Sequence, residues 1–479
     1  MCSHQAKLPI LIITLFGCFL SSYAKNLEDT EKPNIIFIIS DDAGYADFGF
    51  HGADKINTPN LDRIAQQGAV FENAYVSASV CCPSRMGLMT GRYQQRFGAE
   101  CNVPTVPTPG FGKEHLGLDI EEKTIGDQMQ NAGYRTMMIG KWHLGHQAHH
   151  HPLKRGFDEF YGFLGGSRSF WSLDKTNVET AMRRNHEQLD EASEVTYLTD
   201  DLTDAAIDFI ERNHKQPFFI YLSYNAVHTP MHAKVEDIEQ QAQFDQKDRR
   251  IYAAMTKSMD DNIGRLDQFL AKNGLTQNTL VVFTNDNGGA TSNASENNPL
   301  RGYKGSYWEG GIRVPFVMRW PGKIPPQTRY SHSVSTLDLL PTALGAAQAP
   351  AIGKPLDGVD LIPHVNGEKS DPPHHYLYWR LWRTAAIRNG HWKLIRLMDD
   401  PLTQDRRLLA PPILIDLDKD PSETTNLAEQ YPEIVAHLSR KLEAWESGLS
   451  APRWYDGKDW PKWARVQLEN HRMGSVHYE

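Results

Sequence analysis

Polar and ionisable residues come directly after four short apolar runs in this chain of 479 residues. They are, in chain order, Asp41 and Asp42, Lys141 and His143, His228, and Asp286 with Asn287. The carboxylate and amide oxygens of this set are hard donors, which suit Ca²⁺ or Mg²⁺ rather than Zn²⁺. Histidine titrates near neutral pH and can carry protons in a reaction. Brought together, these residue types could hold a divalent cation and move protons beside it.

A second group of reactive residues lies in VCCPSRMGLMTGR, residues 80–92. Pro83 suits the first turn of a helix, which places Cys81 at a helix N-terminus with Arg85 in the first turn. Unpaired N–H groups and the positive end of the helix dipole favour an anion at that position. A thiolate, however, is a soft ligand that does not belong with hard oxygen donors. Either Cys81 stands apart from the metal, or its sulfur has been replaced by oxygen.

The apolar runs before the strand-end residues predict strands at 34–40, 135–139, 218–224 and 280–284. These runs have strand length and no helical period, as expected for strands buried on both faces. Helical patterns alternate with them at 60–67, 124–132, 200–213 and 248–272. The alternation predicts an α/β fold with a large, mostly parallel or mixed sheet between layers of helices. Because the carboxyl ends of such strands share one edge, the polar residues are expected to meet in one crevice.

Beyond Trp320 the sequence becomes rich in proline and glycine, which indicates a domain boundary near residue 371. We expect a catalytic domain over 25–370 and a smaller domain over 371–479. Strand-like runs at 384–387, 392–395 and 413–417, with an amphipathic helix at 432–445, predict a small antiparallel sheet and one helix. Three tryptophans of the tail either pack on the larger domain or stack on sugar rings. They are Trp454, Trp460 and Trp463.

The first 24 residues have the layout of a cleaved secretory signal. Lys7 precedes the apolar run LPILIITLFGCFL, which is too short to span a bilayer, and cleavage is expected after Ala24. The mature protein is therefore expected in the periplasm or outside the cell. A lipoprotein anchored at Cys18 is the alternative, although Phe16 is bulky for a lipobox. The net charge of −9 argues against nucleic acid or an anionic membrane as a partner.

Removal of the signal would leave Cys81, Cys82 and Cys101 in an exported chain. Three cysteines are too few for a disulfide framework. A bridge between Cys82 and Cys101 would leave Cys81 as the odd cysteine. Burial as small hydrophobic residues is the other interpretation.

The letters CCPSR at 81–85, followed by TGR at 90–92, resemble the C-x-P-S-R…T-G-R signature of the formylglycine-dependent sulfatases. The similarity extends over nearly all of the mature chain and implies the alkaline-phosphatase-like sulfatase fold. It includes GKWHLG at 140–145, AVHTP at 226–230, TNDNGG at 284–289, LRGYKGSYWEGGIRVP at 300–315 and DLDKDPSETTNLA at 416–428.

The resemblance implies that a maturation enzyme oxidises Cys81 to Cα-formylglycine, whose hydrated aldehyde attacks the sulfur of a sulfate ester. Cys82 fills the variable position of the signature and has no chemical role. One Ca²⁺ ion would be held by the oxygens of the modified residue 81 and by four further residues. These are Asp41, Asp42, Asp286 and Asn287.

The resemblance also implies catalytic roles for five side chains and for one metal-site carboxylate. Arg85, Lys141 and Lys304 would stabilise the charge on the sulfate oxygens. Asp286 would assist the attack, and His228 with Lys304 would protonate the departing alcohol. His143 would take the proton from the second hydroxyl, which expels sulfate and restores the aldehyde.

Export and the aromatic residues of the chain fit a sulfated polysaccharide or its oligosaccharides as substrate. Candidate substrate contacts are Ser167, Arg168 and Arg301, the aromatic pair Phe170 and Trp171, and the histidines at 149–151. Two alternatives stay open. The first is a phosphomonoester or phosphonate ester hydrolase on the same scaffold, and the second is a catalytically silent relative that binds glycans.

Overall fold

The computed structural model describes residues 32–104, 112–398 and 408–454, and all of these except Lys32 belong to one compact unit. The expected signal segment 1–24, with its lipobox cysteine Cys18, lies outside the described residues. So do Trp460 and Trp463. Within the described ranges, no helix is both long and apolar enough to cross a membrane.

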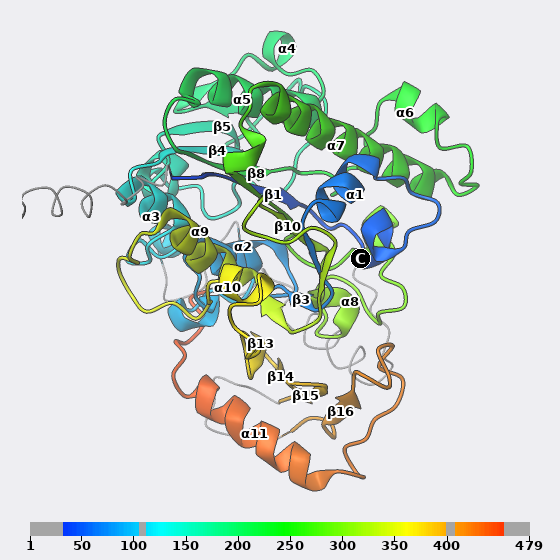
Figure 1. Cartoon of the computed structure of the whole chain (residues 1–479). Helices are drawn as coiled ribbons and strands as arrows, with labels where there is room; N and C mark the ends of the chain where they lie inside the picture. The colour runs from blue at the N-terminus through cyan, green and yellow to red at the C-terminus, as the bar shows by residue number, and fades with distance from the viewer. Residues whose placement is uncertain (1–31, 105–111, 399–407, 455–479) are drawn as a thin grey trace, which may run out of the picture. The chain divides into compact units, whose positions relative to one another are not determined.

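A ten-stranded mixed sheet forms the centre of the fold (Figure 1). Its five middle strands, β9, β1, β8, β4 and β5, are parallel, whereas β10 runs antiparallel to β9. In sheet order the strands are β11 (Thr328–Tyr330), β2 (Ala69–Phe71), β10 (Phe316–Arg319), β9 (Thr279–Asn285), β1 (Asn34–Ser40), β8 (Phe218–Ser223), β4 (Arg135–Lys141), β5 (Glu159–Phe163), β6 (Arg183–Arg184) and β7 (Glu187–Gln188). The four predicted strands are β1, β4, β8 and β9, so the predicted α/β fold with a large mixed sheet is confirmed.

Helices cover both faces of this sheet (Figure 1). One layer contains α1 (Pro59–Gln66), α5 (Leu198–Asn213) and α7 (Lys247–Lys272), and the other contains α2 (Cys81–Thr90), α3 (Ile125–Asn131) and α9 (Leu339–Ala347). Strand β1 shows why its sequence is apolar throughout. Ile36 and Ile38 join the core beneath the first layer, whereas Ile35 and Phe37 join the core beneath the second. Because both faces are buried, the strand reads as a continuous apolar run.

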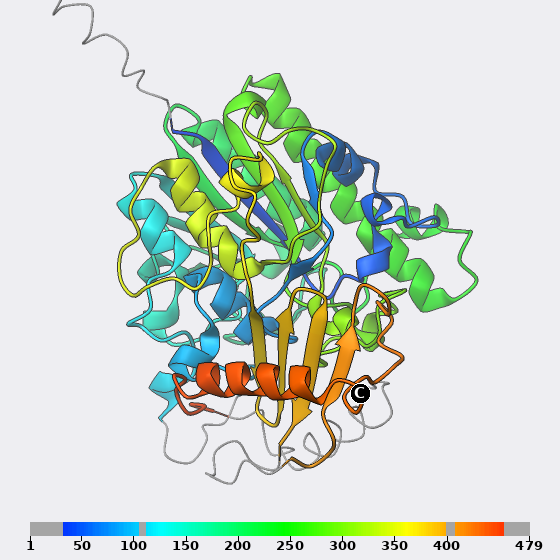
Figure 2. The same ribbon diagram turned by 60° about the horizontal axis from the view of Figure 1, so that its bottom comes forward.

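A four-stranded antiparallel sheet follows, with one long helix on its outer face (Figure 2). Its elements are β13 (Leu377–Leu381), β14 (Thr384–Asn389), β15 (Trp392–Leu397), β16 (Ile413–Asp416) and α11 (Pro432–Glu446). Ile387 and Leu394 pack against Leu442 of α11, whereas Trp379 and Ile395 on the other face join the core of the large sheet. The predicted small sheet and helix are confirmed, and the boundary at residue 370 stays a prediction.

Short elements complete the described fold. Besides several short 3₁₀ helices, they include β3 (Ala74–Tyr75), which pairs with β12 (Val334–Ser335), and the helices α4 (Glu191–Glu194), α6 (Val235–Glu239), α8 (Glu309–Ile312) and α10 (Ile362–Val365). Trp454 is fully buried, and its Nε1 donates to the carbonyl of Cys101 at 3.0 Å. Of the two interpretations of the tail tryptophans, packing therefore describes this one.

Candidate active site

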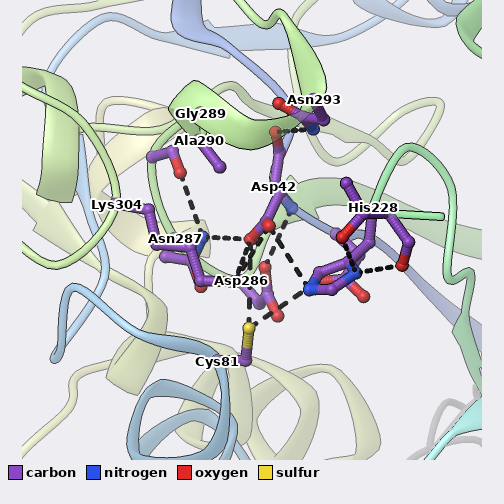
Figure 3. Close-up of polar contacts among 12 residues, drawn as sticks. Asp42, Cys81, His228, Asp286, Asn287, Gly289, Ala290, Asn293 and Lys304 are labelled. Carbon is purple, nitrogen blue, oxygen red and sulfur yellow. Dashed lines mark hydrogen bonds and ion pairs between the residues drawn. The ribbon is translucent and has the colours of Figure 1, made fainter. Parts of the chain in front are cut away.

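The predicted strand-end residues lie at the carboxyl edge of the large sheet. Figure 3 shows four of them, Asp42, His228, Asp286 and Asn287, beside Cys81. Asp41 and Asp42 follow β1, Lys141 ends β4 with His143 just beyond, His228 lies in the segment after β8, and Asp286 and Asn287 follow β9. Helix α2 begins at Cys81, as Pro83 predicts. A carboxylate oxygen of each aspartate after β1, the Cys81 sulfur and a ring nitrogen of His228 all lie within 4.8 Å of one another.

Cys81 is almost completely buried among carboxylates. Its Sγ lies 3.8 Å from Oδ1 of Asp41 and 3.9 Å from Oδ1 of Asp42. Burial raises the pKa of the Cys81 thiol to about 12, which Lys141 and Lys304 oppose only in part. An unmodified Cys81 is therefore a neutral thiol at pH 7, and a neutral thiol is neither a metal ligand nor an effective nucleophile.

Arg85 and Lys141 are buried cations that pair with the carboxylates. Arg85 Nε donates to Oδ2 of Asp286 at 2.8 Å, and its Nη1 donates to Ser223 Oγ at 2.5 Å. Lys141 Nζ donates to Oδ2 of Asp41 at 2.6 Å. Burial raises the pKa of Asp41, to which Asp286 adds, whereas Arg85 and Lys141 outweigh burial and lower the pKa of Asp286. Arg85 and Lys141 thus help to keep this dense group of carboxylates together.

The third cation is Lys304, which comes from the loop between β9 and β10. Its Nζ lies 2.8 Å from Oδ1 of Asp42, and Asn287 Nδ2 donates to the same oxygen at 2.7 Å (Figure 3). Burial alone would raise the pKa of Asp42, but Lys304 and His228 outweigh it and lower that pKa. Asp42 also has a left-handed backbone, with φ of 60°. Its main chain is held there by Asn293, whose Nδ2 donates to the Asp42 carbonyl at 3.0 Å.

His143 is half-buried, and its imidazole is electrically neutral. Burial lowers its pKa well below the ordinary value, and Lys141 and Arg85 add to the effect. Its Nδ1 is buried without a hydrogen-bond partner among the residues described. The ring lies so close to Gly166 that a Cβ at that position would approach within 2.7 Å of it. A neutral imidazole with an unsatisfied nitrogen can accept a proton.

His228 is also half-buried, with 16% of its side chain exposed. Its Nδ1 lies 2.5 Å from the carbonyl of Thr229, and its Nε2 lies 3.5 Å from Oδ2 of Asp42. Because a carbonyl only accepts hydrogen bonds, Nδ1 carries a hydrogen. Nε2 is therefore the nitrogen at which His228 can exchange a proton.

The predicted substrate contacts have different environments. Ser167 is exposed beside Gly166. Arg168 is buried, and its five N–H groups are used by Glu191 in a two-oxygen pair and by the carbonyls of Ser169, Thr180 and Trp171. This guanidinium holds its own loop rather than a ligand. Arg301 is half-buried, with its guanidinium 4.1 Å from the ring centroid of Trp308.

The donor set fits a hard cation such as Ca²⁺. Asp41, Asp42 and Asp286 offer carboxylate oxygens. Oδ1 of Asn287 is buried and, among the described residues, has no hydrogen-bond partner. A buried oxygen without a donor is costly unless a ligand completes it. Oxygen donors of this kind are those that Ca²⁺ prefers.

Some supporting residues were not identified from the sequence. Asn285 accepts from Ser40 Oγ at 2.9 Å and donates to the carbonyl of Ala43 at 2.8 Å, so it fixes the acidic loop after β1. Asn293 joins that loop to the carbonyl of Val227 at 2.9 Å. Asn285 lies beside Asp286 in TNDNGG, which was a usable signal, whereas nothing near Asn293 in the sequence marks its role.

The chain matches two family models. The model described as Sulfatase covers residues 33–349, and the model described as N-sulphoglucosamine sulphohydrolase, C-terminal, covers residues 303–448. The structure of Ps i-CgsB in complex with k-i-k-neocarrahexaose is 35% identical to this chain, with a TM-score of 0.81. The match covers 93% of this chain and 99% of that one.

Two curated relatives are similar along most of their length. The N-acetylgalactosamine-6-O-sulfatase of Bacteroides thetaiotaomicron is 30% identical, and the match covers 91% of this chain and 98% of that protein. The N-acetylgalactosamine-6-sulfatase of Mus musculus is 33% identical, with coverage of 76% and 72%. This chain, with its cysteine among strand-end carboxylates and cations, belongs to the sulfatase family and is a sulfuric ester hydrolase.

Proposed function

We propose that the protein removes ester sulfate from a sulfated polysaccharide or its oligosaccharides. The observation that carries this proposal is the position of Cys81 at the start of α2, within 4 Å of two carboxylates and surrounded by Arg85, Lys141 and Lys304. Relatives named for N-acetylgalactosamine 6-sulfate and a solved relative that binds a neocarrahexaose support a carbohydrate substrate.

Formylglycine at position 81 and one Ca²⁺ ion complete the proposed site. The surroundings of Cys81 support its conversion, because burial raises the pKa of the thiol and a neutral thiol is neither a metal ligand nor an effective nucleophile. Asp41, Asp42, Asp286 and Asn287 would hold the ion, which would supply positive charge for the sulfate oxygens. The hydrated aldehyde of formylglycine supplies the attacking oxygen.

The chain's own residues orient the sulfate and move protons. Arg85, Lys141 and Lys304 bind the sulfate oxygens, on which charge is held as the group transfers. Asp286 accepts the proton of the attacking hydroxyl. His228 donates from Nε2 to the departing alcohol, assisted by Lys304. Neutral His143 then accepts the proton whose removal restores the aldehyde.

An exposed tryptophan on a well-fixed loop supports the carbohydrate part of the proposal. Trp171 is 40% exposed although its loop is fixed on several sides. Arg168 binds its carbonyl, and its ring rests on Tyr197 with centroids 4.8 Å apart. Ser169 of this loop contacts Nδ1 of His232, four residues beyond His228. A rigid, half-exposed indole can stack on a sugar ring at little entropic cost.

Hydrolysis of matched esters tests the reaction. We expect kcat/KM for 4-nitrophenyl sulfate to exceed that for 4-nitrophenyl phosphate, measured on protein co-expressed with a formylglycine-generating enzyme. A preference for the phosphate would replace sulfatase by phosphatase activity. A screen of defined sulfated oligosaccharides, read by release of inorganic sulfate, then identifies the sugar and the position.

A further inference from the structure

Three buried charged residues connect the small sheet to the loop that carries Lys304. We call Lys393 of β15, Glu309 of α8 and Glu423 of the turn after β16 the clamp; none of their side chains is exposed. Lys393 Nζ lies 2.8 Å from Oε1 of each glutamate. Oε2 of Glu309 accepts from the Tyr75 hydroxyl at 2.6 Å, and Oε2 of Glu423 accepts from the Glu309 N–H at 2.6 Å. All four carboxylate oxygens are therefore hydrogen-bonded.

Stability alone is a weak reason for such a cluster. Replacing buried ion pairs by apolar groups of similar volume is often neutral or stabilising. Glu423 also has a left-handed backbone, with φ of 54°, which is costly for a residue with a side chain. Burial raises the pKa of Glu423 to about 7, with Lys393 opposing the rise and Glu309 adding to it. What the clamp contributes is a fixed geometry.

That geometry concerns the loop from Pro299 to Glu309. Ser422 Oγ donates to the carbonyl of Pro299 at 2.9 Å, and Arg301 donates to the carbonyl of Glu423. The Glu309 N–H at the far end of the loop binds the Glu423 carboxylate. Both ends of the loop are thus bonded to the same two-residue turn of the small sheet.

The middle of the loop is bonded to the catalytic segments. The N–H of Lys304 donates to the carbonyl of Gly289 at 3.0 Å, two residues after Asn287. The N–H of Gly305 donates to the carbonyl of Ser79 at 2.7 Å, two residues before Cys81. A shift at either end of the loop would therefore move the Lys304 ammonium relative to Asp42, from which it lies 2.8 Å.

We propose that Glu423, held by Lys393, is a positioning residue for Lys304, so that the small sheet sets the geometry of leaving-group assistance. This inference rests on the proposed function, in which Lys304 assists His228 in protonating the departing alcohol. A displacement of about 1 Å at a catalytic group can reduce the rate by about 10²-fold. The loss should depend on how much the leaving group needs that assistance.

A series of aryl sulfates measures that dependence without knowledge of the natural sugar. The leaving phenolates of 4-nitrophenyl, 3-nitrophenyl and phenyl sulfate become more basic in that order, so they need increasing assistance. We expect Glu423→Gln to reduce kcat/KM for phenyl sulfate by at least about tenfold while 4-nitrophenyl sulfate loses less than about threefold. A merely structural role would reduce all three equally, by the loss of folded protein.

Arg396→Met is the matched control. Arg396 lies on the same strand as Lys393, but its guanidinium pairs with Glu446 and Glu443 of α11, at 2.6 and 3.1 Å. The substitution removes a largely buried charge from the small sheet and leaves every described contact of the Lys304 loop in place. We expect its losses, if any, to be equal across the three esters.

A double-mutant cycle with Lys304→Ala isolates the coupling. If Glu423 acts through Lys304, adding Glu423→Gln to Lys304→Ala should reduce kcat/KM for phenyl sulfate no further. Additive losses, or an equal loss for all three esters, would overturn the inference. Should Glu423→Gln fail to fold, Ser422→Ala removes one bond of the same turn at a half-buried position and should give a smaller selective loss. A wild-type protein that hydrolyses none of the esters would instead overturn the proposed function.

Discussion

The protein contains two buried clusters of opposite charges that differ in how completely they are satisfied. In the catalytic cluster, Asn287 Oδ1, Arg85 Nη2 and His143 Nδ1 have no hydrogen-bond partner within the part of the chain that the structure describes. In the clamp, every carboxylate oxygen of Glu309 and Glu423 accepts a hydrogen bond. Both clusters are largely buried, and both pair lysine with carboxylates.

This difference distinguishes a cluster that can bind a ligand from a cluster that fixes protein segments in place. An unsatisfied buried polar atom costs about 1–3 kcal/mol. Such atoms persist where a ligand completes them, as an anion would for Arg85 and a cation for Asn287. In the clamp, every carboxylate oxygen already accepts a hydrogen bond from the protein, so none is left without a partner for a ligand. The clamp can therefore influence catalysis only through the segments that it connects. Charge and burial alone would not distinguish the two.

The largest effect is expected at Cys81, the proposed nucleophile position in the first cluster. Cys81→Ala should reduce kcat for 4-nitrophenyl sulfate by about 10⁴-fold or more, because no other residue can supply the attacking group. Cys82→Ala is the matched control, since Cys82 is its buried neighbour without a predicted chemical role. It should leave kcat/KM unchanged. The rates of both variants are measured as initial rates on protein whose melting curve matches that of the wild type. A wild-type rate in Cys81→Ala would refute the mechanism.

Substitutions in the clamp should change the free energy of unfolding. Removing only the lysine should lower it, whereas also removing the two carboxylate charges should raise it again. Lys393→Met removes the cation that the two buried carboxylates share and leaves Glu309 only the more distant Arg313 and Arg388, at 3.7 and 3.8 Å. It should lower the free energy of unfolding by about 3 kcal/mol. Adding Glu309→Gln and Glu423→Gln removes those charges and should recover most of the loss. Denaturant unfolding measures each value. A triple variant that is less stable than Lys393→Met would show that the charges themselves stabilise the fold.

Ligand binding should distinguish the two clusters directly. At a Ca²⁺ concentration 100 times its Kd, the wild-type protein should gain about 2.7 kcal/mol of stability, because the ion binds only the folded state. Asn287→Ala removes the unsatisfied oxygen and should weaken Ca²⁺ binding, as read by calorimetry and by the shift in melting temperature. Glu423→Gln, in the other cluster, should bind Ca²⁺ like the wild type. Equal weakening in both variants would erase the distinction.

The sequence predicted the elements whose signals are local. Strand β1 is predicted at 34–40, which are its bounds in the structure, because burial on both faces makes its residues apolar without interruption. Asp42 and Asp286 could be placed together because strand ends share an edge. Bonds between distant segments could not be predicted: Lys393 lies 84 positions from Glu309. Arg168 was predicted as a substrate contact because the sequence around it does not reveal its pairing with Glu191, 23 positions away.

The pair of Arg168 and Glu191 resembles the clamp in being fully bonded, and it suggests where a smaller effect lies. The ion pair fixes the loop from which Trp171 projects into solvent, so the indole is held in place and is available to contact a ligand.

Trp171→Ala should reduce kcat/KM by up to about tenfold for the sulfated oligosaccharide that the wild type desulfates fastest, since an aromatic contact contributes about 0.5–1.5 kcal/mol. The variant should hydrolyse 4-nitrophenyl sulfate at the wild-type rate, because that ester has no second sugar to stack on the ring. Trp171→Phe, which keeps an aromatic face, should restore part of the loss. Equal losses on both substrates would mean that Trp171 supports the site's structure, and the division between groups that hold and groups that bind would then fail in this loop.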